Sequence, residues 1–349
     1  MSSVLITGAS KGIGRATATE LAQRGHRVIA TARNPRTLDD LDVDQRLSLD
    51  VTNQASVQAA VEQAGEIDVL ISNAGVIFTA AAEASPPTEI ERLFAQNTVG
   101  AIRVVQAVLP QMRERKKGRL LFVSSVAGRA VVPGSSAYSA TKWALEAFAE
   151  TLALELATFG IDVSLAEPGA VSSGALDDVL TYSLPDDPYA AQLTRRGTGS
   201  EMISPERVAS ALADLVERTT VPLRVLVGAW AERVIAARNA APYDQPFSRP
   251  PASTKEYLVV LNIMTPDSAD PAEVDRVRTA QGARVKELTA AGYVVRLWKP
   301  ATDGTTIALC RATDETDLRT NALDTLPTHT WQTLEVTELR PHPSDPVLT

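Results

Sequence analysis

Short runs of apolar and β-branched residues alternate with longer amphipathic segments along the first two thirds of the chain. Runs of this length, separated by segments with helical period, are typical of a parallel sheet whose strands are joined by crossover helices. We predict strands at residues 4–7, 27–31, 46–49, 69–72, 119–123, 162–166 and 224–227. The pattern therefore predicts an α/β fold with a doubly wound parallel sheet.

This alternation stops at a proline-rich stretch, residues 240–254, which contains Pro242, Pro246, Pro250 and Pro251. Proline removes backbone donors and interrupts helices, so we interpret this stretch as a linker. The pattern beyond it predicts a strand, a helix, two strands, a helix and a strand, at 256–263, 271–291, 293–299, 305–311, 314–323 and 333–339. That order is typical of a smaller ferredoxin-like α+β domain. We therefore expect domains at 1–239 and 255–349, joined by the linker.

Composition and charge narrow the classes of partner. The chain has 349 residues, of which 44% are hydrophobic and 22% charged, which excludes a disordered protein. The net charge of -8 is unsuited to nucleic acid or an anionic membrane. Its one cysteine, Cys310, offers neither an intrachain disulfide nor metal-ligand spacing, so we predict no metal. With no signal sequence or membrane-length apolar run, we expect a cytoplasmic protein.

A glycine-rich turn follows the first predicted strand, where residues 7–14 read Thr-Gly-Ala-Ser-Lys-Gly-Ile-Gly. Glycines at a strand-to-helix turn let the backbone approach a pyrophosphate, and the next helix offers free N–H groups. An ordinary tight turn is the alternative for an isolated glycine cluster. The predicted cofactor contacts here are Gly8, Ser10, Lys11, Gly12, Ile13 and Gly14.

The candidate acid is a tyrosine close to a lysine. Tyr138 and Lys142 lie four residues apart in a segment with helical period, which puts them on one face. An ammonium favours the ionised phenol and lowers its pKa from about 10, so the pair is suited to protonating a carbonyl oxygen. The alternative is that Tyr138 and Lys142 are a pair of surface residues without a catalytic role. Ser125 stands at the end of the fifth predicted strand, where its hydroxyl is suited to binding the substrate oxygen. The neighbouring Ser124 is the alternative candidate for this role.

The glycine spacing, Gly-x-x-x-Gly-x-Gly, resembles that of the short-chain dehydrogenase/reductase family, over residues 1 to about 238. Further motifs stand where that family requires them: Asp50-Val51, Asn73-Ala74-Gly75, Asn97, Ser125, Tyr138 with Lys142, and Pro168-Gly169. The resemblance implies a Rossmann-type fold and favours Ser125 over Ser124. It also implies that Asn97 holds a water linking Lys142 to solvent, local hydrogen bonds being the alternative.

The same resemblance implies contacts with a nicotinamide cofactor. Asp50 would contact its adenine end, Val51 would border the ring, and Ser173 stands where the family usually has a threonine that binds the carboxamide. The predicted contacts beyond the glycine turn are Arg33, Asp50, Val51, Asn73, Ala74, Gly75, Tyr138, Lys142, Pro168, Gly169, Val171 and Ser173.

The end of the second predicted strand indicates which nucleotide is used. An NAD-dependent enzyme usually has a carboxylate there, which binds the ribose hydroxyls of the adenosine, but this strand ends Thr31-Ala32-Arg33. Arg33 and Lys11 are suited to pairing with the 2′-phosphate of NADP, the alternative being two solvated basic residues. We therefore predict NADP(H).

Residues 255 to about 346 resemble muconolactone delta-isomerase, a small ferredoxin-like protein that forms oligomers. The similar stretches include Pro271-Ala272-Glu273, Leu297-Trp298 and Leu326-Pro327. His329 lies in a stretch that is apolar and aromatic in those isomerases, so it departs from their pattern. We interpret His329 as more consistent with a surface or capping residue than with an acid or base.

Together these features predict an NADP(H)-dependent oxidoreductase that reduces the ketone of a small metabolite to an alcohol. The tail is expected to support homo-oligomerisation or to shape the substrate entrance. A bifunctional reductase and isomerase is one alternative. A non-catalytic NADP sensor is another, and the set of Ser125, Tyr138, Lys142 and Asn97 argues against it, since a sensor needs no acid.

Overall fold

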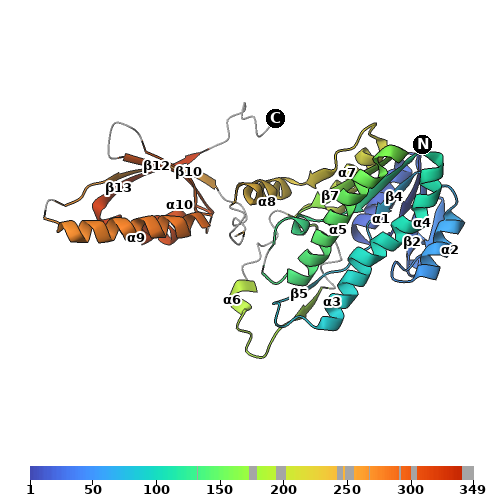
Figure 1. Cartoon of the computed structure of the whole chain (residues 1–349), viewed down its shortest axis with the longest axis horizontal. Coiled ribbons are helices and arrows are strands. Elements are labelled where there is room, and N and C mark those ends of the chain that lie inside the picture. The colour runs from blue at the N-terminus through green and yellow to red at the C-terminus, as the bar shows by residue number, and fades with distance from the viewer. Residues whose placement is uncertain are drawn as a thin grey trace. The chain divides into compact units, whose positions relative to one another are not determined.

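The computed structural model describes residues 1–131, 133–172, 179–193, 202–241, 247, 255–266, 268–290, 292–299 and 305–339. It divides into two compact units, the first comprising the described residues up to Ala240 and the second those after it (Figure 1). No helix in these described ranges is both long and apolar enough to cross a membrane.

A seven-stranded parallel sheet forms the centre of the first unit, as predicted. All seven predicted strands are present, with ends that differ by two residues at most. In spatial order the strands are β3 (Gln45–Ser48), β2 (Arg27–Ala32), β1 (Ser3–Ile6), β4 (Val69–Ser72), β6 (Gly118–Val123), β7 (Ile161–Pro168) and β9 (Arg224–Val227).

Helices cover both faces of this sheet. Side chains from α2, α4 and α5 form the core on one face, and side chains from α1 and α7 form the core on the other. Leu5 points to the first core, whereas its neighbours Val4 and Ile6 point to the second. Burial on both faces explains why these strands read as continuous apolar runs. The helices are α1 (Gly12–Gln23), α2 (Gln54–Ala64), α3 (Pro87–Phe94), α4 (Gly100–Arg115), α5 (Ser136–Leu156), α6 (Ala190–Leu193), α7 (Pro205–Glu217) and α8 (Ala229–Ala240).

The winding of the sheet reverses between β1 and β4, which are neighbours in the sheet but distant in the chain. In open parallel sheets, ligands bind outside the carboxyl ends of the strands at such a switch point. The glycine turn follows β1, Asn73 follows β4 and Ser125 lies just beyond β6. The topology therefore gathers the predicted site residues at one edge of the sheet.

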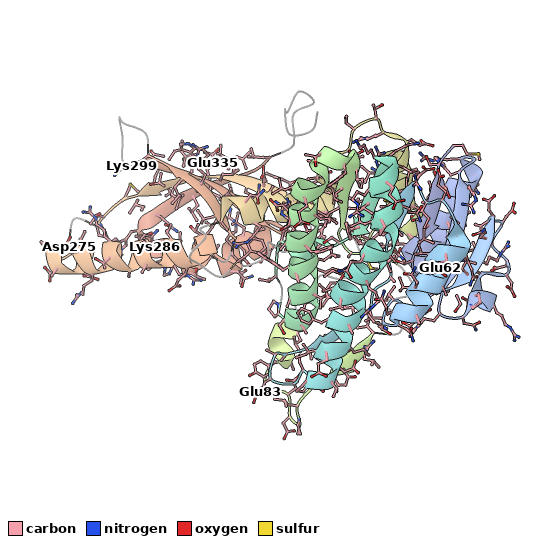
Figure 2. All side chains as sticks on the ribbon, turned by 45° about the vertical axis from the view of Figure 1, so that its right-hand side comes forward. Glu62, Glu83, Asp275, Lys286, Lys299 and Glu335 are labelled. Carbon is pink, nitrogen blue, oxygen red and sulfur yellow. The ribbon has the colours of Figure 1, made fainter. Side chains whose placement is uncertain are left out.

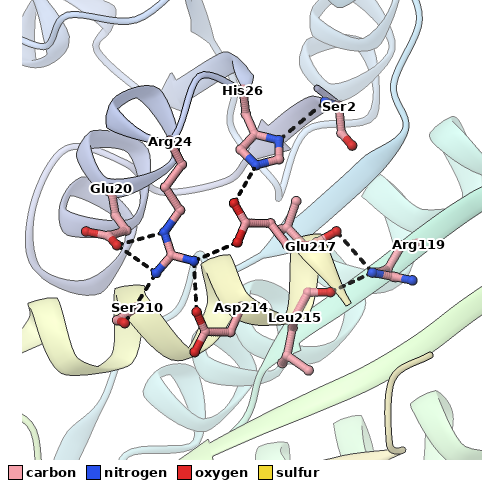
Figure 3. Close-up of polar contacts among 10 residues, drawn as sticks. Ser2, Glu20, Arg24, His26, Arg119, Ser210, Asp214, Leu215 and Glu217 are labelled. Atoms are coloured by element: carbon pink, nitrogen blue, oxygen red, sulfur yellow. Dashed lines mark hydrogen bonds and ion pairs between the residues drawn. The ribbon is translucent and has the colours of Figure 1, made fainter. Parts of the chain in front are cut away.

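An ion-pair network around Arg24 ties α7 to the end of α1 (Figure 3). The Nη1 atom of Arg24 lies 2.8 Å from Asp214 Oδ1 and 2.9 Å from Glu217 Oε2, while its Nη2 atom lies 2.8 Å from Glu20 Oε1. His26 Nε2 lies 3.3 Å from the second carboxylate oxygen of Glu217. The two helices on this face are thus joined by charge as well as by apolar packing.

A small two-stranded sheet, β5 (Phe78–Ala80) with β8 (Leu180–Tyr182), is a feature that we did not predict. The rings of Phe78 and Tyr182 meet edge to face, with centroids 5.6 Å apart. Phe78 belongs to a small apolar cluster that Tyr138 also contacts. This sheet therefore packs close to the candidate acid.

The second unit has the predicted β-α-β-β-α-β order. Its antiparallel sheet has the strand order β11-β12-β10-β13, and buried apolar residues from the sheet and both helices form one core. Figure 2 shows Asp275 and Lys286 along α9, on the opposite side of the sheet from Glu335 on β13. The elements are β10 (Lys255–Ile263), α9 (Pro271–Ala290), β11 (Val294–Trp298), β12 (Thr305–Ala312), α10 (Glu315–Asn321) and β13 (Gln332–Leu339).

Candidate active site

A cleft of about 700 Å³ opens at the carboxyl ends of the parallel strands. Gly14 and Asn97 lie outside its lining, and Ser173 lies outside the described residues. The other predicted site residues all line it: Gly8, Ser10, Lys11, Gly12, Ile13, Arg33, Asp50, Val51, Asn73, Ala74, Gly75, Ser125, Tyr138, Lys142, Pro168, Gly169 and Val171.

Two glycines of the turn, Gly8 and Gly14, pack too closely against their neighbours to carry a side chain. Gly8 has a φ of +70°, and a Cβ atom added to it would lie 2.9 Å from the Cα of Ala74. A Cβ atom on Gly14 would lie 2.4 Å from both Asn73 Nδ2 and the carbonyl oxygen of Gly8. Gly14 therefore packs against Gly8 and Asn73 outside the lining of the cleft, where it supports the turn. The exposed backbone at the start of α1 fits the pyrophosphate of a dinucleotide.

Asn73 holds this turn in place. Its Nδ2 atom donates hydrogen bonds to the carbonyl oxygens of Thr7, at 2.9 Å, and Gly8, at 3.1 Å. The backbone N–H groups of Asn73 and Ala74 both donate to Thr7 Oγ1, at 3.0 Å. The residues after β4 thus fix the shape of the turn after β1, in addition to lining the cleft.

Lys11 and Arg33 are both exposed side chains that line the cleft. The Asp50 carboxylate accepts hydrogen bonds from the Oγ1 atom of Thr52, at 2.7 Å, and from its backbone N–H, at 2.9 Å. These bonds, together with the charges of Arg33 and Arg103, hold the pKa of Asp50 below its usual range. Asp50 is therefore ionised at neutral pH.

Ser125 and Tyr138 approach each other from two different elements. Ser125 follows β6, and its Oγ atom accepts a hydrogen bond of 3.1 Å from the backbone N–H of Ala127. Burial raises the pKa of Tyr138 to about 12, and a hydrogen bond with Ser125 acts in the opposite direction. Our expectation of a lowered phenol pKa is therefore wrong for this structure, because the effect of burial exceeds that of the hydrogen bond with Ser125. Tyr138 keeps its proton at neutral pH.

Lys142 is held beneath the phenol. Its Nζ atom lies 5.8 Å from the centroid of the Tyr138 ring and donates a 2.8 Å hydrogen bond to the carbonyl oxygen of Val123. The residue is only 5% exposed. Burial lowers the pKa of Lys142 to about 8, and the charge of Glu146 opposes that effect.

Asn97 lies in a π-helical turn, Ala95–Val99, between α3 and α4, and is 1% exposed. Its Oδ1 atom accepts a 2.8 Å hydrogen bond from the N–H of Val76. Its Nδ2 atom donates to the carbonyl oxygen of Val76, at 2.8 Å, and to Thr141 Oγ1, at 3.1 Å. The amide thus ties the segment after Gly75 to the residue that precedes Lys142. Its role in a water relay stays a prediction.

Several residues that line the cleft were not predicted, among them Arg92, Gln96 and Leu180. Arg92 and Gln96 are four residues apart in the helical segment before Asn97, so their spacing was a usable signal. Leu180 belongs to the three-residue strand β8, which forms only by pairing with β5. Such a strand leaves no periodic signal in the sequence.

Comparison with known proteins identifies the family of each unit. The chain matches the short chain dehydrogenase family over residues 2–181 and the muconolactone delta-isomerase family over residues 255–345. A 3-ketodihydrosphingosine reductase from Bacteroides thetaiotaomicron is 34% identical over 244 residues. That match covers 67% of this chain and 90% of the relative.

Two solved structures are similar to the first unit. A short-chain dehydrogenase from Streptomyces avermitilis has 37% identity and a TM-score of 0.60, covering 66% of this chain and 89% of its own. A 3-ketoacyl-(acyl-carrier-protein) reductase from Brucella melitensis, complexed with NADH, has 26% identity and a TM-score of 0.55, covering 64% and 96%.

The matched region contains the glycine turn, Asn97, Ser125, Tyr138 and Lys142, and extends past β7. A nicotinamide dinucleotide is the cofactor that suits this site and that relatives of this type use. The chain is an oxidoreductase that belongs to the short-chain dehydrogenase family and carries a muconolactone delta-isomerase domain in its C-terminal part.

Proposed function

We propose that this protein reduces the ketone of a small metabolite to an alcohol, with NADPH as cofactor and Tyr138 as proton donor. The observation that carries the proposal is the convergence of three side chains, Ser125, Tyr138 and Lys142, in the cleft that the glycine turn also lines. Binding of a nucleotide and protonation of a carbonyl oxygen are thereby combined in one site.

The chemistry assigns a task to each side chain. When bound, the nicotinamide cofactor supplies a hydride to the carbonyl carbon. The Ser125 hydroxyl stabilises the charge that develops on the carbonyl oxygen, and the Tyr138 phenol gives its proton to that oxygen. The Lys142 ammonium then stabilises the phenolate that remains. The raised pKa of Tyr138, about 12, supports proton transfer from the phenol to the carbonyl oxygen, because the phenol is protonated when the reaction begins.

The preference for NADPH is supported by charge at the end of β2. Arg33 lines the cleft there, Lys11 lines it at the glycine turn, and guanidinium pairs well with phosphate. Asp50, the carboxylate that lines this part of the cleft, accepts two hydrogen bonds from Thr52. The adenosine end of the site thus favours an added phosphate over bare ribose hydroxyls.

A ketone as substrate is supported by two of the similar proteins. The relatives from Bacteroides thetaiotaomicron and Brucella melitensis are both named as reductases of 3-keto compounds. We infer the same bond change for this chain, the conversion of a ketone to a secondary alcohol.

For the second unit we infer a role in association or in shaping the substrate entrance. The ring of His329, one of the ionisable residues of this unit, bonds locally: its Nδ1 atom lies 3.1 Å from the carbonyl oxygen of Leu326. This bond supports a capping role for His329 rather than proton transfer.

The direct test is a panel of ketones and 3-keto esters incubated with the full-length protein and NADPH, followed by loss of NADPH absorbance. We expect turnover with at least one ketone, and the reverse reaction with the product alcohol and NADP⁺. The Ser125→Ala variant is the matched control and should lose most of this turnover. Absence of nicotinamide oxidation or reduction with every ketone and alcohol tried would overturn the proposal.

A further inference from the structure

A buried cluster of charged residues lies behind Lys142, centred on Glu146 of α5. Glu146 is 4% exposed and Glu167, at the end of β7, is 0% exposed. The Nε atom of Arg224 lies 2.9 Å from Glu146 Oε2 and 3.3 Å from Glu167 Oε1. Arg129 Nη1 lies 3.2 Å from the other oxygen of Glu167. The two carboxylates therefore meet at one guanidinium nitrogen.

This cluster is aligned with the candidate catalytic residues. Tyr138, Lys142 and Glu146 follow one another at four-residue spacing, so they share a face of α5. An ideal Cβ atom on Gly128 would lie 3.1 Å from Ser124 Oγ and 3.3 Å from Glu146 Oε1. The bare glycine thus leaves the carboxylate close to the residue that precedes Ser125.

Three polar atoms here make no hydrogen bond within the described part of the chain. They are Ser124 Oγ and Glu146 Oε1, and Glu167 Oε1, which ion-pairs with Arg224, is a third; all are buried. A buried acceptor without a partner is costly, and it is retained where function needs it. Glu146 Oε1 is therefore a buried carboxylate oxygen available to act electrostatically on Lys142.

The cluster also has an ionisation close to neutral pH. Burial and the negative charge of Glu146 raise the pKa of Glu167, the charges of Arg129 and Arg224 lower it, and the net result is a pKa of about 7. The Glu167 carboxylate therefore takes up a proton as the pH falls through this range.

We propose that Glu146 is a positioning residue that keeps the Lys142 ammonium charged and thereby sets the upper pH limit of the reductase reaction. The charged groups that face Glu146 are Lys142 and Glu150 on α5, Glu167 on β7, Arg224 on β9, and Arg129 after the turn at Val126–Gly128. This inference rests on the proposed function, because it acts through the role of Lys142 in that reaction.

The need for such a group follows from the burial of Lys142. Burial alone lowers the pKa of its ammonium, and a neutral amine would not stabilise the Tyr138 phenolate. Asn97 cannot supply a charge, and its amide is bonded to Val76 and Thr141. Glu146 is the group whose charge raises the pKa of Lys142.

The test is the pH profile of kcat for ketone reduction by the full-length Glu146→Gln variant. Removing the carboxylate charge should move the alkaline limb of the profile to lower pH by about one unit. Glu146→Asp keeps the charge and should restore the limb. Glu150→Gln is the matched control, because Glu150 also pairs with Arg224 but is 55% exposed, and its profile should equal that of the wild type. An unmoved limb in a folded Glu146→Gln protein overturns the inference.

Should Glu146→Gln fail to fold, a second measurement replaces it. Coupling between two ionisable sites is reciprocal, so removal of the ammonium in Lys142→Met should raise the pH midpoint of the buried carboxylates. ¹³C NMR of glutamate-labelled wild-type and variant protein measures that midpoint. Equal midpoints would overturn the inference.

The Tyr138→Phe variant, measured in the same buffers, separates the two proposals. Retained turnover in that variant refutes the proposed function. Lost turnover in Tyr138→Phe, together with an unmoved alkaline limb in the pH profile of Glu146→Gln, refutes only this inference.

Discussion

The Nζ atom of Lys142 lies 5.8 Å from the centroid of the Tyr138 ring, while its hydrogen bond goes to the carbonyl oxygen of Val123. The lysine is thus fixed by β6 rather than by the phenol itself. Burial keeps the Tyr138 phenol protonated at neutral pH by raising its pKa to about 12. The proposed function requires this state, because the phenol must still hold its proton when the substrate binds.

Replacement of Tyr138 by Phe removes this proton and little else. We expect the turnover of a ketone to fall at least about 100-fold, the usual contribution of a positioned acid. NADPH binding should stay within a few-fold of the wild type, because the glycine turn, Arg33 and Asp50 are unchanged. Steady-state kinetics and a fluorescence titration with NADPH measure the two effects. A variant that still reduces ketones at the wild-type rate would refute the assignment of Tyr138.

Replacement of Arg33 by Ala tests the choice of nucleotide. Loss of an arginine paired with phosphate should weaken NADPH binding by about 10- to 100-fold, whereas NADH binding should hardly change. Arg36→Ala is the matched control, since Arg36 is exposed and nearby but does not line the cleft. Equal NADPH affinities in the wild type and Arg33→Ala would contradict the NADPH preference.

Much of the fold and most of the site could be predicted because their signals are local. The strands of the parallel sheet are short apolar runs, and Tyr138 and Lys142 are joined by helical spacing. The charged cluster escaped prediction because Glu146, Glu167 and Arg224 come from α5, β7 and β9, which meet only in the folded sheet. The pKa of Tyr138 was predicted in the wrong direction, because sequence shows the neighbouring lysine but not the depth of burial.

Gly14→Ala tests the support of the glycine turn. The added methyl group would meet Asn73 Nδ2 and the carbonyl oxygen of Gly8 at 2.4 Å, so the turn must shift. We expect weaker binding of both NADPH and NADH and a loss of stability of about 1–3 kcal/mol. Gly282→Ala is the control, because nothing lies within 4 Å of a Cβ atom there. Unchanged affinity and melting temperature in Gly14→Ala would show that the turn is looser than the structure indicates.

Glu167→Gln tests the buried carboxylate through protein stability. The folded state raises the pKa of Glu167 from 4.5 to about 7, so it binds the proton more tightly than the unfolded chain. The stabilisation that this proton provides is complete below about pH 4.5 and is lost as the pH rises to 7. The wild type should therefore lose on the order of 1–3 kcal/mol relative to Glu167→Gln across this window. Urea denaturation at several pH values measures the difference, and a constant difference would contradict the raised pKa.

The sheet of the second unit has one face that no helix covers within the described ranges, and we expect this face to mediate self-association. Leu258 and Val260 on β10 pair with Leu309 and Ile307 on β12, on the face opposite to the core residues Val259 and Ala308. Trp298 of β11 pairs with Ile307 and is 41% exposed, so the apolar surface continues across three strands. A four-stranded sheet with a single helical layer leaves such a face to be buried by a partner, and a second copy of the same face provides matching apolar surface.

The variant Ile307→Asp tests this association. It places an aspartate at the centre of the uncovered face, where the carboxylate would be buried unpaired in the interface. We therefore expect fewer subunits per assembly, measured by light scattering at several concentrations. Lys286→Asp is the matched control, because it places the same side chain on the exposed surface of α9 and should leave the assembly unchanged (Figure 2). Equal masses for the wild type and a folded Ile307→Asp protein would exclude association through this face and would favour the isomerase alternative or a role at the substrate entrance for the second unit.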